Sequence, residues 1–251
     1  MSDDDLVRAL VVGVPARDEE TRIAACLLSV LAAVSALDRD VAVAVVVAND
    51  DSFDATDALI DTIAACEPLV HAIHGGWRSA GGTRRAAIDH GLHVLASAGF
   101  TDANSIWIAT TDADTTVSTD WLLRHLHHAE SGHDALAGVV DLTDDDDRTA
   151  EVLATFTELY ELGPESHLHV HGANLGIRAS AYLAAGGFPE VTVSEDHALW
   201  NELRRQEFRV VSPVDVRVST SVRLQGRAAG GFADTMARIM AARVQQSEAV
   251  A

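Results

Sequence analysis

Two aspartates, Asp112 and Asp114, directly follow the apolar segment SIWIATT and are separated by one alanine. If that segment is a strand, the alternation of side chains sends both carboxylates to the same side where the strand ends. Carboxylates placed in this way hold Mg²⁺ or Mn²⁺, and phosphate oxygens complete the coordination. The spacing alone is equally consistent with a turn or a helix cap, because Asp-x-Asp occurs five times in this chain. The apolar flanks IWIA and WLL distinguish this pair from the other copies, which are Asp3/Asp5, Asp38/Asp40, Asp144/Asp146 and Asp145/Asp147.

Polar clusters end three of the expected strands. They are PARDEE at 15–20, NDDSFD at 49–54 and TDADT at 111–115. A single cluster would be ordinary turn chemistry. Three of them indicate a ligand site, because the carboxyl ends of parallel strands meet at one edge of a sheet, where ligands bind.

Strand and helix alternate through the first half of the chain. Apolar runs predict strands, and apolar residues at spacings of three and four predict helices between them. This alternation predicts an α/β fold with a mostly parallel central sheet and helices on both faces. The expected strands span 8–16, 41–50, 69–75 and 105–112, and the expected helices span 19–37, 55–66, 79–97 and 119–130.

The second half is less regular. LAGVVDL at 136–142 predicts another strand, and the four aspartates at 144–147 predict a solvated loop. The segment 171–179 predicts a short strand or turn. No repeat or linker is visible, so we expect one domain over residues 1–251. Further helices are expected at 152–162, 179–187, 195–206 and 231–246.

The composition argues against several kinds of partner. A formal net charge of -20 disfavours binding to nucleic acid or to an anionic membrane surface. The first ten residues, MSDDDLVRAL, lack the basic and apolar regions of a signal peptide, and VAVAVVVA at 41–48 is too short to span a bilayer. We therefore expect a cytoplasmic protein without membrane insertion, in which Cys26 and Cys66 are reduced core thiols.

A second group of candidate residues lies between positions 169 and 200. Gly172 and Gly176 allow the backbone to approach a ligand closely. Glu195 and Asp196 open an expected helix, where the helix dipole favours carboxylates whatever their function. The functional alternative is that one of the two is a general base at the mouth of a pocket.

Four segments together resemble the family 2 glycosyltransferases. PARDEE, NDDSFDAT, TDADTTVSTDWL and GANLGIRASAYLAAGGFP with the following SEDHALW occur in the order found in that family, over residues 8–205. The resemblance implies the GT-A fold, a nucleoside-diphosphate sugar as donor, Mg²⁺ or Mn²⁺ as cofactor, and an acceptor hydroxyl that attacks with inversion. It implies a nucleotide-binding half at about 8–115, an acceptor and catalytic half at about 116–225, and a C-terminal helix at about 230–248.

The resemblance also implies roles for single residues. Asp112 and Asp114 would hold the metal, with Asp114 the more direct ligand, and Asp196 would be the general base. Glu195 beside it would orient the base or bind the acceptor. The turn Asn49-Asp50-Asp51-Ser52 departs from the Asp-Asp-Gly-Ser-like turn of the family, which leaves open which acid meets the nucleotide base. The residues implied to surround the nucleotide sugar are Pro15, Ala16, Glu19, Asp50, Arg78, Arg84, Asp112, Gly172, Ala173 and Asn174.

Two further sets of residues keep more than one interpretation. Three arginines near the C-terminus either form a lid that clamps the diphosphate or are solvated charges. Three alternating histidines favour contacts with substrate or acceptor over a zinc site, because no cysteine or other fourth ligand is near. The third interpretation is that they are ordinary hydrogen-bonded histidines. No histidine follows His197 in the sequence, although some GT-A enzymes use a histidine in their C-terminal part as a further metal ligand. These residues are Arg217, Arg223 and Arg227, and His167, His169 and His171.

Two other functions compete with glycosyl transfer. One is a GT-A-fold partner protein that binds nucleotide sugars without turnover; the presence of Asp112, Asp114 and Asp196 argues against it. The other is a sugar nucleotidyltransferase, whose first loop would be rich in glycine, unlike VPARDEETR. The donor sugar, the acceptor and the oligomeric state, including a homodimer, stay open.

Overall fold

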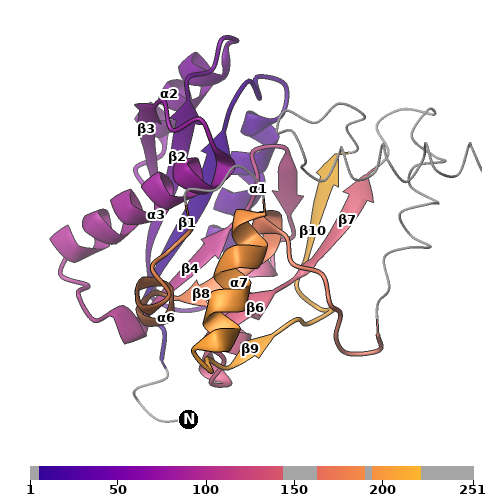
Figure 1. The fold of residues 1–251 in the computed structure, drawn as a ribbon. Coiled ribbons are helices and arrows are strands. Elements are labelled where there is room, and N and C mark those ends of the chain that lie inside the picture. Colours follow the sequence, from indigo (N-terminus) through magenta and orange to yellow (C-terminus); the bar gives the residue numbers. More distant parts are fainter. Residues whose placement is uncertain (1–5, 144–162, 190–193, 222–251) are drawn as a thin grey trace, which may run out of the picture.

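A seven-stranded sheet forms the centre of the computed structural model, which describes residues 6–143, 163–189 and 194–221 (Figure 1). In spatial order its strands are β3 (Val70–Gly75), β2 (Ala42–Asp50), β1 (Ala9–Ala16), β4 (Ile106–Thr110), β8 (Leu175–Arg178), β6 (Ala135–Ala137) and β9 (Val210–Val211). The first four are parallel to one another, β8 is antiparallel to both of its neighbours, and β9 is parallel to β6. The prediction of a mostly parallel central sheet is confirmed.

Helices cover both faces of this sheet (Figure 1). One face is covered by α1 (Ile23–Ser35), α2 (Thr56–Cys66) and α4 (Trp121–Glu130), and the other by α3 (Ala80–Ser97), α6 (Ala179–Ala184) and α7 (Glu195–Arg205). In β1, Leu10 and Val12 pack in the first layer while Val11 packs in the second. A strand covered on both faces needs apolar residues at every position, which explains the unbroken aliphatic runs in the sequence.

A smaller sheet carries the segment that follows the Asp-x-Asp pair. Its order is β5 (Thr115–Val117), β10 (Arg217–Ser221) and β7 (Val139–Thr143), with β10 antiparallel to β5 and parallel to β7. The prediction of one strand over 136–142 was wrong, because the chain leaves the central sheet at Gly138 and continues as β7 in the smaller sheet. A Cβ at Gly138 would lie 2.3 Å from Asn174 Nδ2 and 2.6 Å from the Val216 carbonyl oxygen, so glycine is needed at this crossing.

Most of the other predicted helices and strands are confirmed, and the remaining predicted segments lie outside the described residues. Every strand and helix expected between residues 8 and 130 is present, as are the short elements expected at 171–206. The helices expected at 152–162 and 230–248 and the loop expected at 144–147 lie outside the described residues. No helix in the described part of the chain combines the length and apolarity needed to cross a membrane.

The two cysteines have different environments, and the expectation of two core thiols was wrong for one of them. Both are free; Cys26 in α1 is buried, but Cys66 is exposed. Cys66 is the last residue of α2, at the end of its amphipathic pattern. Burial raises the pKa of the Cys26 thiol, and Asp114 and Asp112 nearby raise it further, so this thiol stays protonated.

Candidate active site

The carboxyl ends of β1, β2 and β4 bring the three polar clusters to one edge of the sheet. In the strand register Ala16 lies opposite Asn49, and Gly13 lies opposite Thr110. Backbone-to-side-chain hydrogen bonds join the first two clusters. The Asp18 amide donates to Ser52 Oγ at 2.9 Å, the Glu19 amide to Thr56 Oγ1 at 2.6 Å, and the Phe53 amide to Asp18 Oδ1 at 2.7 Å. The convergence predicted from the sequence is therefore present.

Strained backbone accompanies these clusters. Non-glycine residues with positive φ cost about 1–3 kcal/mol each and collect at functional sites. Such residues occur in the loops after β1, β2 and β3 and directly before α7. They are Asp18 at 51°, Asp51 at 48°, Arg78 at 58° and Ser194 at 61°.

Asp50 at the end of β2 organises the loop before α3. It is 4% exposed, and its Oδ1 accepts a hydrogen bond from the backbone amide of Arg78 at 2.9 Å. Arg17 approaches its Oδ2 at 3.7 Å. The Arg78 side chain is exposed, whereas Ala16 and Glu19 are buried and Pro15 is half-buried at the end of β1. Of these residues, Arg17 and Arg78 leave positive charge accessible on this side of the site.

Asp112 and Asp114 lie just beyond β4, which ends at Thr110. The Thr115 amide donates to the Asp112 carbonyl oxygen at 3.0 Å, so a turn and not a continued strand places the two side chains. Ala113 between them is buried in the core at 3% exposure, and both aspartates are half-buried. Asp114 Oδ1 accepts hydrogen bonds from Thr115 Oγ1 at 3.4 Å and from Thr220 Oγ1 at 3.3 Å. Two half-buried carboxylates in one turn are a candidate donor set for Mg²⁺ or Mn²⁺.

Arg84 occupies an interior position between two carboxylates. Its side chain is 5% exposed; Nη2 donates to Asp112 Oδ1 at 2.5 Å, and Nη1 donates to Glu195 Oε1. Burial by itself would lower the pKa of Arg84, but Asp112 and Glu195 raise it above its ordinary value, so the guanidinium stays charged. The side chain lies in the protein interior and is shared between two parts of the site.

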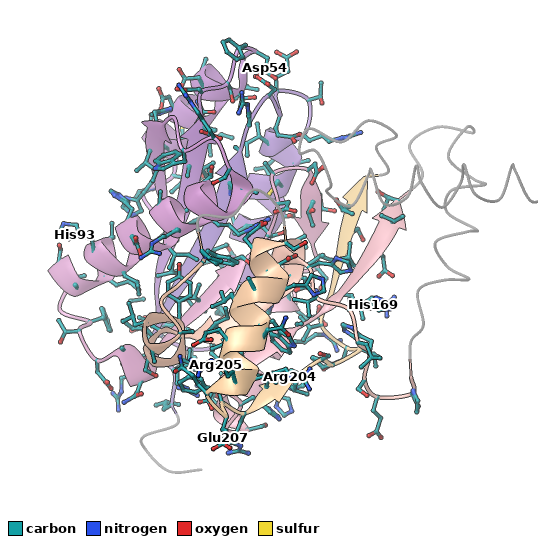
Figure 2. All side chains as sticks on the ribbon, viewed as in Figure 1. Asp54, His93, His169, Arg204, Arg205 and Glu207 are labelled. Carbon is teal, nitrogen blue, oxygen red and sulfur yellow. The ribbon has the colours of Figure 1, made fainter. Side chains whose placement is uncertain are left out.

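The first turn of α7 carries two carboxylates with different surroundings. Glu195 is 8% exposed and bonded to Arg84, whereas Asp196 is half-buried. Asp196 Oδ2 accepts from the Gly172 amide at 3.0 Å, and its Oδ1 accepts from the His197 amide at 2.7 Å. The opposite end of α7, with Arg204, lies far from the edge marked by Asp54 (Figure 2). Asp196 is therefore the carboxylate of this pair that is held in position and still accessible.

The Gly172–Asn174 turn (η3) is held in place by hydrogen bonds to the neighbouring strands. Thr110 Oγ1 donates to the Gly172 carbonyl oxygen at 2.7 Å. The side chain of Asn174 is fully buried, and its amide group is hydrogen-bonded to neighbouring segments of the fold. Its Oδ1 accepts from Trp121 Nε1 at 3.0 Å, and its Nδ2 donates to the Val139 and Val216 carbonyl oxygens at 2.9 and 3.1 Å. Gly172 and Ala173 are buried as well.

Three histidines lie beside the turn and form a stack. The ring centroids of His167 and His169 are 5.8 Å apart, and those of His169 and His171 are 6.2 Å apart. Burial lowers the pKa of His171 to about 4, although Asp196 opposes this shift. Within the described part of the chain, the nitrogens of these three rings are not gathered around one point, as the ligands of a zinc ion would be.

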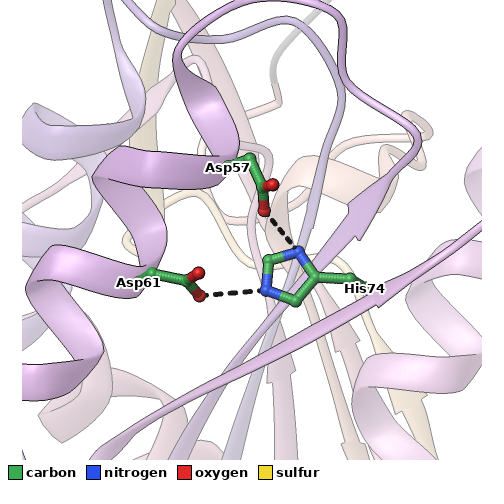
Figure 3. A group of neighbouring side chains, drawn as sticks. All are labelled: Asp57, Asp61 and His74. Carbon is green, nitrogen blue, oxygen red and sulfur yellow. Dashed lines mark hydrogen bonds and ion pairs between the residues drawn. The ribbon is translucent and has the colours of Figure 1, made fainter.

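A different cluster could bind a cation, and it lies beside this edge at the ends of β2 and β3. Asp57 and Asp61 on α2 flank His74 on β3 (Figure 3). Asp57 Oδ1 lies 2.7 Å from Nδ1 of the ring, and Asp61 Oδ1 lies 3.0 Å from Nε2. Asn49 Nδ2 at the end of β2 approaches Asp57 Oδ1 at 3.4 Å and His74 Nδ1 at 3.3 Å. Because each ring nitrogen faces a different carboxylate and all three side chains are exposed, we interpret the cluster as a surface hydrogen-bonded network.

Sequence reasoning missed the residues that support the site from distant segments. Thr220 reaches Asp114 only because β10 pairs with β5, and no local signal in VRVSTS marks this role. Thr110 precedes the aspartate pair, so its position in the motif was a usable signal. Arg217 lies in β10 and pairs with Asp141 of β7, while Arg223 and Arg227 lie outside the described residues.

The fold and the site together define a GT-A nucleotide-diphospho-sugar transferase fold. Solved structures with this architecture resemble the chain. They include S. aureus TarS 1–349 (TM-score 0.59, 16% identity, 86% of this chain and 61% of that chain). PcManGT, a mannosyltransferase from Pyrobaculum calidifontis solved with GDP-Man and Mn²⁺, has a TM-score of 0.57 at 19% identity, over 88% of this chain and 59% of that chain. GalNAc-T7, solved with UDP, GalNAc and Mn²⁺, has a TM-score of 0.63 at 12% identity, over 92% of this chain and 46% of that chain.

Residues 11–183 match the family model described as Glycosyl transferase family 2, and the chain belongs to that family. No curated protein matches the sequence. The chain spans 61% or less of the length of each of the solved chains named above. At these identities the structural likeness establishes the fold.

Proposed function

We propose that this protein is a metal-dependent inverting glycosyltransferase that moves a sugar from a nucleoside diphosphate to an acceptor hydroxyl. The observation that carries the proposal is that four neighbouring carboxylates have different environments. Asp112 and Asp114 are half-buried in the turn after β4, Asp196 is half-buried and fixed by the Gly172 amide, and Arg84 pairs with both Asp112 and Glu195. This arrangement would supply a cation site and a separate base.

Asp114 and Asp112 would hold Mg²⁺ or Mn²⁺. A divalent ion bound there neutralises the charge that develops on the diphosphate as its bond to the sugar breaks. The donor complexes of PcManGT with GDP-Man and Mn²⁺ support this class of donor and cofactor. Asp50 and the exposed Arg78 would lie along the nucleotide, because Asp50 ends β2 and Arg78 lies in the loop after β3 at this edge.

Asp196 would remove the proton from the acceptor. As the acceptor oxygen forms its bond to the anomeric carbon, the bond from that carbon to the diphosphate breaks, and the proton passes to Asp196. Two backbone amides, those of Gly172 and His197, fix the carboxylate, so it needs little reorganisation when the acceptor binds. One displacement inverts the anomeric centre, and no covalent intermediate on the protein is needed.

The test compares Asp114→Ala and Asp196→Asn with wild type. Thermal shift with UDP or GDP and Mn²⁺ measures nucleotide binding, and hydrolysis of UDP- or GDP-sugars with Mn²⁺ measures turnover. Asp114→Ala is expected to lose metal-dependent nucleotide binding. Asp196→Asn is expected to keep binding and to lose transfer once the acceptor is found. A matched control is Asp61→Asn, in the exposed cluster of Figure 3, whose carboxylate contacts His74 at 3.0 Å; it is expected to change neither quantity.

Two results would contradict the proposal. If neither nucleoside diphosphate stabilises the wild type, it does not bind this class of donor. If Asp196→Asn transfers at the rate of wild type, Asp196 is not the base. Tight binding without turnover for any nucleotide sugar would instead favour a partner protein that binds nucleotide sugars.

A further inference from the structure

We propose that Arg84 is a positioning residue that couples the metal-binding carboxylate Asp112 to the helix that carries Asp196. This inference rests on the proposed function for the roles of Asp112 and Asp196. The coupling itself rests on the contacts of Arg84, which do not depend on those roles. In this proposal Arg84 is an internal counter-ion and does not bind the phosphates of the nucleotide.

The geometry of the guanidinium group supports this role. One terminal nitrogen donates to Asp112 on the loop after β4, and the other donates to Glu195 in the first turn of α7, 83 residues further along the chain. Arginine suits such a bridge because its donors diverge from a rigid planar group. Glu195 is covalently adjacent to Asp196, so a shift of Arg84 relative to Asp112 moves the turn that holds the base.

Arg84 is enclosed by the groups that it bridges. The side chain is 5% exposed, and its guanidinium lies 5.6 Å from the ring centroid of Phe188. A Cβ at Gly172 would lie 2.5 Å from Arg84 Cζ, so the turn packs directly against the guanidinium. Arg84 Nε is buried without a hydrogen-bond partner among the described residues, so the two terminal nitrogens carry its bonds to the carboxylates. Turning Nη1 from Glu195 toward a phosphate would leave that carboxylate, 11% exposed, without its counter-ion, which is strongly destabilising.

Close packing between α3 and α7 gives the bridge a rigid frame. A Cβ at Gly81, in the first turn of α3, would lie 2.8 Å from the Pro189 carbonyl oxygen and 3.0 Å from Glu195 Cβ. The two helices therefore approach each other to contact distance where Arg84 crosses between them. Gly81 of the segment SAGGTRR therefore lets α7 approach α3.

The test uses Arg84→Lys, with Arg85→Lys as the matched control. Lysine keeps the charge but cannot span both carboxylates. Arg85 is the next residue of the same helix; its guanidinium is 44% exposed and donates to the Gly186 and Phe188 carbonyl oxygens. Three quantities are measured for each protein: hydrogen exchange of the amides at 194–205, the Kd for UDP or GDP with Mn²⁺, and the kcat for hydrolysis of the corresponding nucleotide sugar.

Arg84→Lys is expected to speed exchange in the first turn of α7 and to lower kcat by about tenfold or more, since misplaced catalytic groups carry costs of this size. The Kd for the nucleotide is expected to change by less than about threefold, because the lost interaction positions groups for the reaction and does not bind the nucleotide. Arg85→Lys is expected to leave all three quantities near those of wild type. If Arg84→Lys does not fold, Glu195→Gln weakens the same bridge from the other side and is expected to show the same pattern to a smaller degree.

Two results would overturn the proposal. Unchanged exchange at 194–205 together with unchanged kcat would show that Arg84 does not couple the two parts. A large rise in Kd with kcat retained would make Arg84 a phosphate ligand. If the wild type binds no nucleoside diphosphate, the proposed function fails, and the exchange measurement still decides whether Arg84 holds α7 in place.

Discussion

Replacing Asn174 by alanine is expected to lower the free energy of unfolding by about 4 kcal/mol. The side chain of Asn174 is fully buried and accepts or donates in three hydrogen bonds, to Trp121, Val139 and Val216. Its amide joins the turn before β8 in the central sheet to the start of β7 and to the residue before β10 in the smaller sheet.

The magnitude follows from what alanine leaves behind. Each hydrogen bond contributes about 1 kcal/mol net, and a buried donor without a partner costs about 1–3 kcal/mol more. The indole N–H of Trp121 is such a donor, because Trp121 is fully buried and Asn174 Oδ1 is its acceptor. For a chain of this size, a loss of about 4 kcal/mol lowers the Tm by about 8–16 °C.

The assay is chemical and thermal unfolding followed by circular dichroism, with Asn104→Ala as control. Asn104 is exposed in the turn before β4, so its replacement is expected to change stability by less than about 0.5 kcal/mol. A variant Asn174→Ala with the Tm of wild type and a raised KM for the donor would refute the reasoning. It would mean that Asn174 contacts the sugar, as the resemblance to the family implies.

Three further predictions concern buried positions. Burial lowers the pKa of His125 to about 3 from its usual 6.5. On acidification His125 is therefore protonated in the unfolded chain before it is protonated in the folded protein, and the free energy of unfolding falls as the pH drops from 6.5 towards 3. The slope is about 1.4 kcal/mol per pH unit, and His125→Gln should remove it in urea titrations at pH 7 and 5; equal slopes in both proteins would contradict this. Gly91→Ala places a Cβ 2.4 Å from Val11 Cγ1 and should lower the free energy of unfolding by about 1–3 kcal/mol in urea, although alanine favours helix formation. A more stable variant would show that Val11 and its neighbours can move to make room for the methyl group. Thr110→Val removes the hydroxyl that donates to the Gly172 carbonyl and should lower the free energy of unfolding by about 1–2 kcal/mol in the same measurement. An unchanged midpoint of urea unfolding would mean that Gly172 is held by its other contacts.

Local patterns were sufficient to predict the parallel part of the fold. The strands β1, β2 and β4 are largely apolar runs and β3 is a weaker one, and each of the first three is followed by a helix with its own periodicity. Because parallel strands deliver their carboxyl ends to one edge, the sequence also predicted where the polar clusters meet. The period of two does not account for Asp112 and Asp114, because β4 ends at Thr110 and a turn places the pair.

The parts that the sequence could not predict depend on contacts between distant segments. The split at Gly138 is set by the approach of Asn174 and Val216; the glycine is visible in LAGVVDL, but the distant residues that require it are not. The burial of Arg84 depends on Glu195, which lies 111 residues away. A sequence pattern shows which side chains carry charge, but only the assembled structure shows which charges neutralise one another.

The place of β10 in the smaller sheet has a consequence for folding. β10 is late in the chain, but it lies between β5 and β7 and brings Thr220 to Asp114 across a separation of 106 residues. Until residues 217–221 have been synthesised, β5 and β7 have no strand between them, and their edges are open to wrong pairing. Closing so long a loop is slow relative to forming neighbouring strand and helix pairs. We expect the parallel half to fold first, so that a growing chain acquires its scaffold well before it acquires the hydroxyl group that supports Asp114.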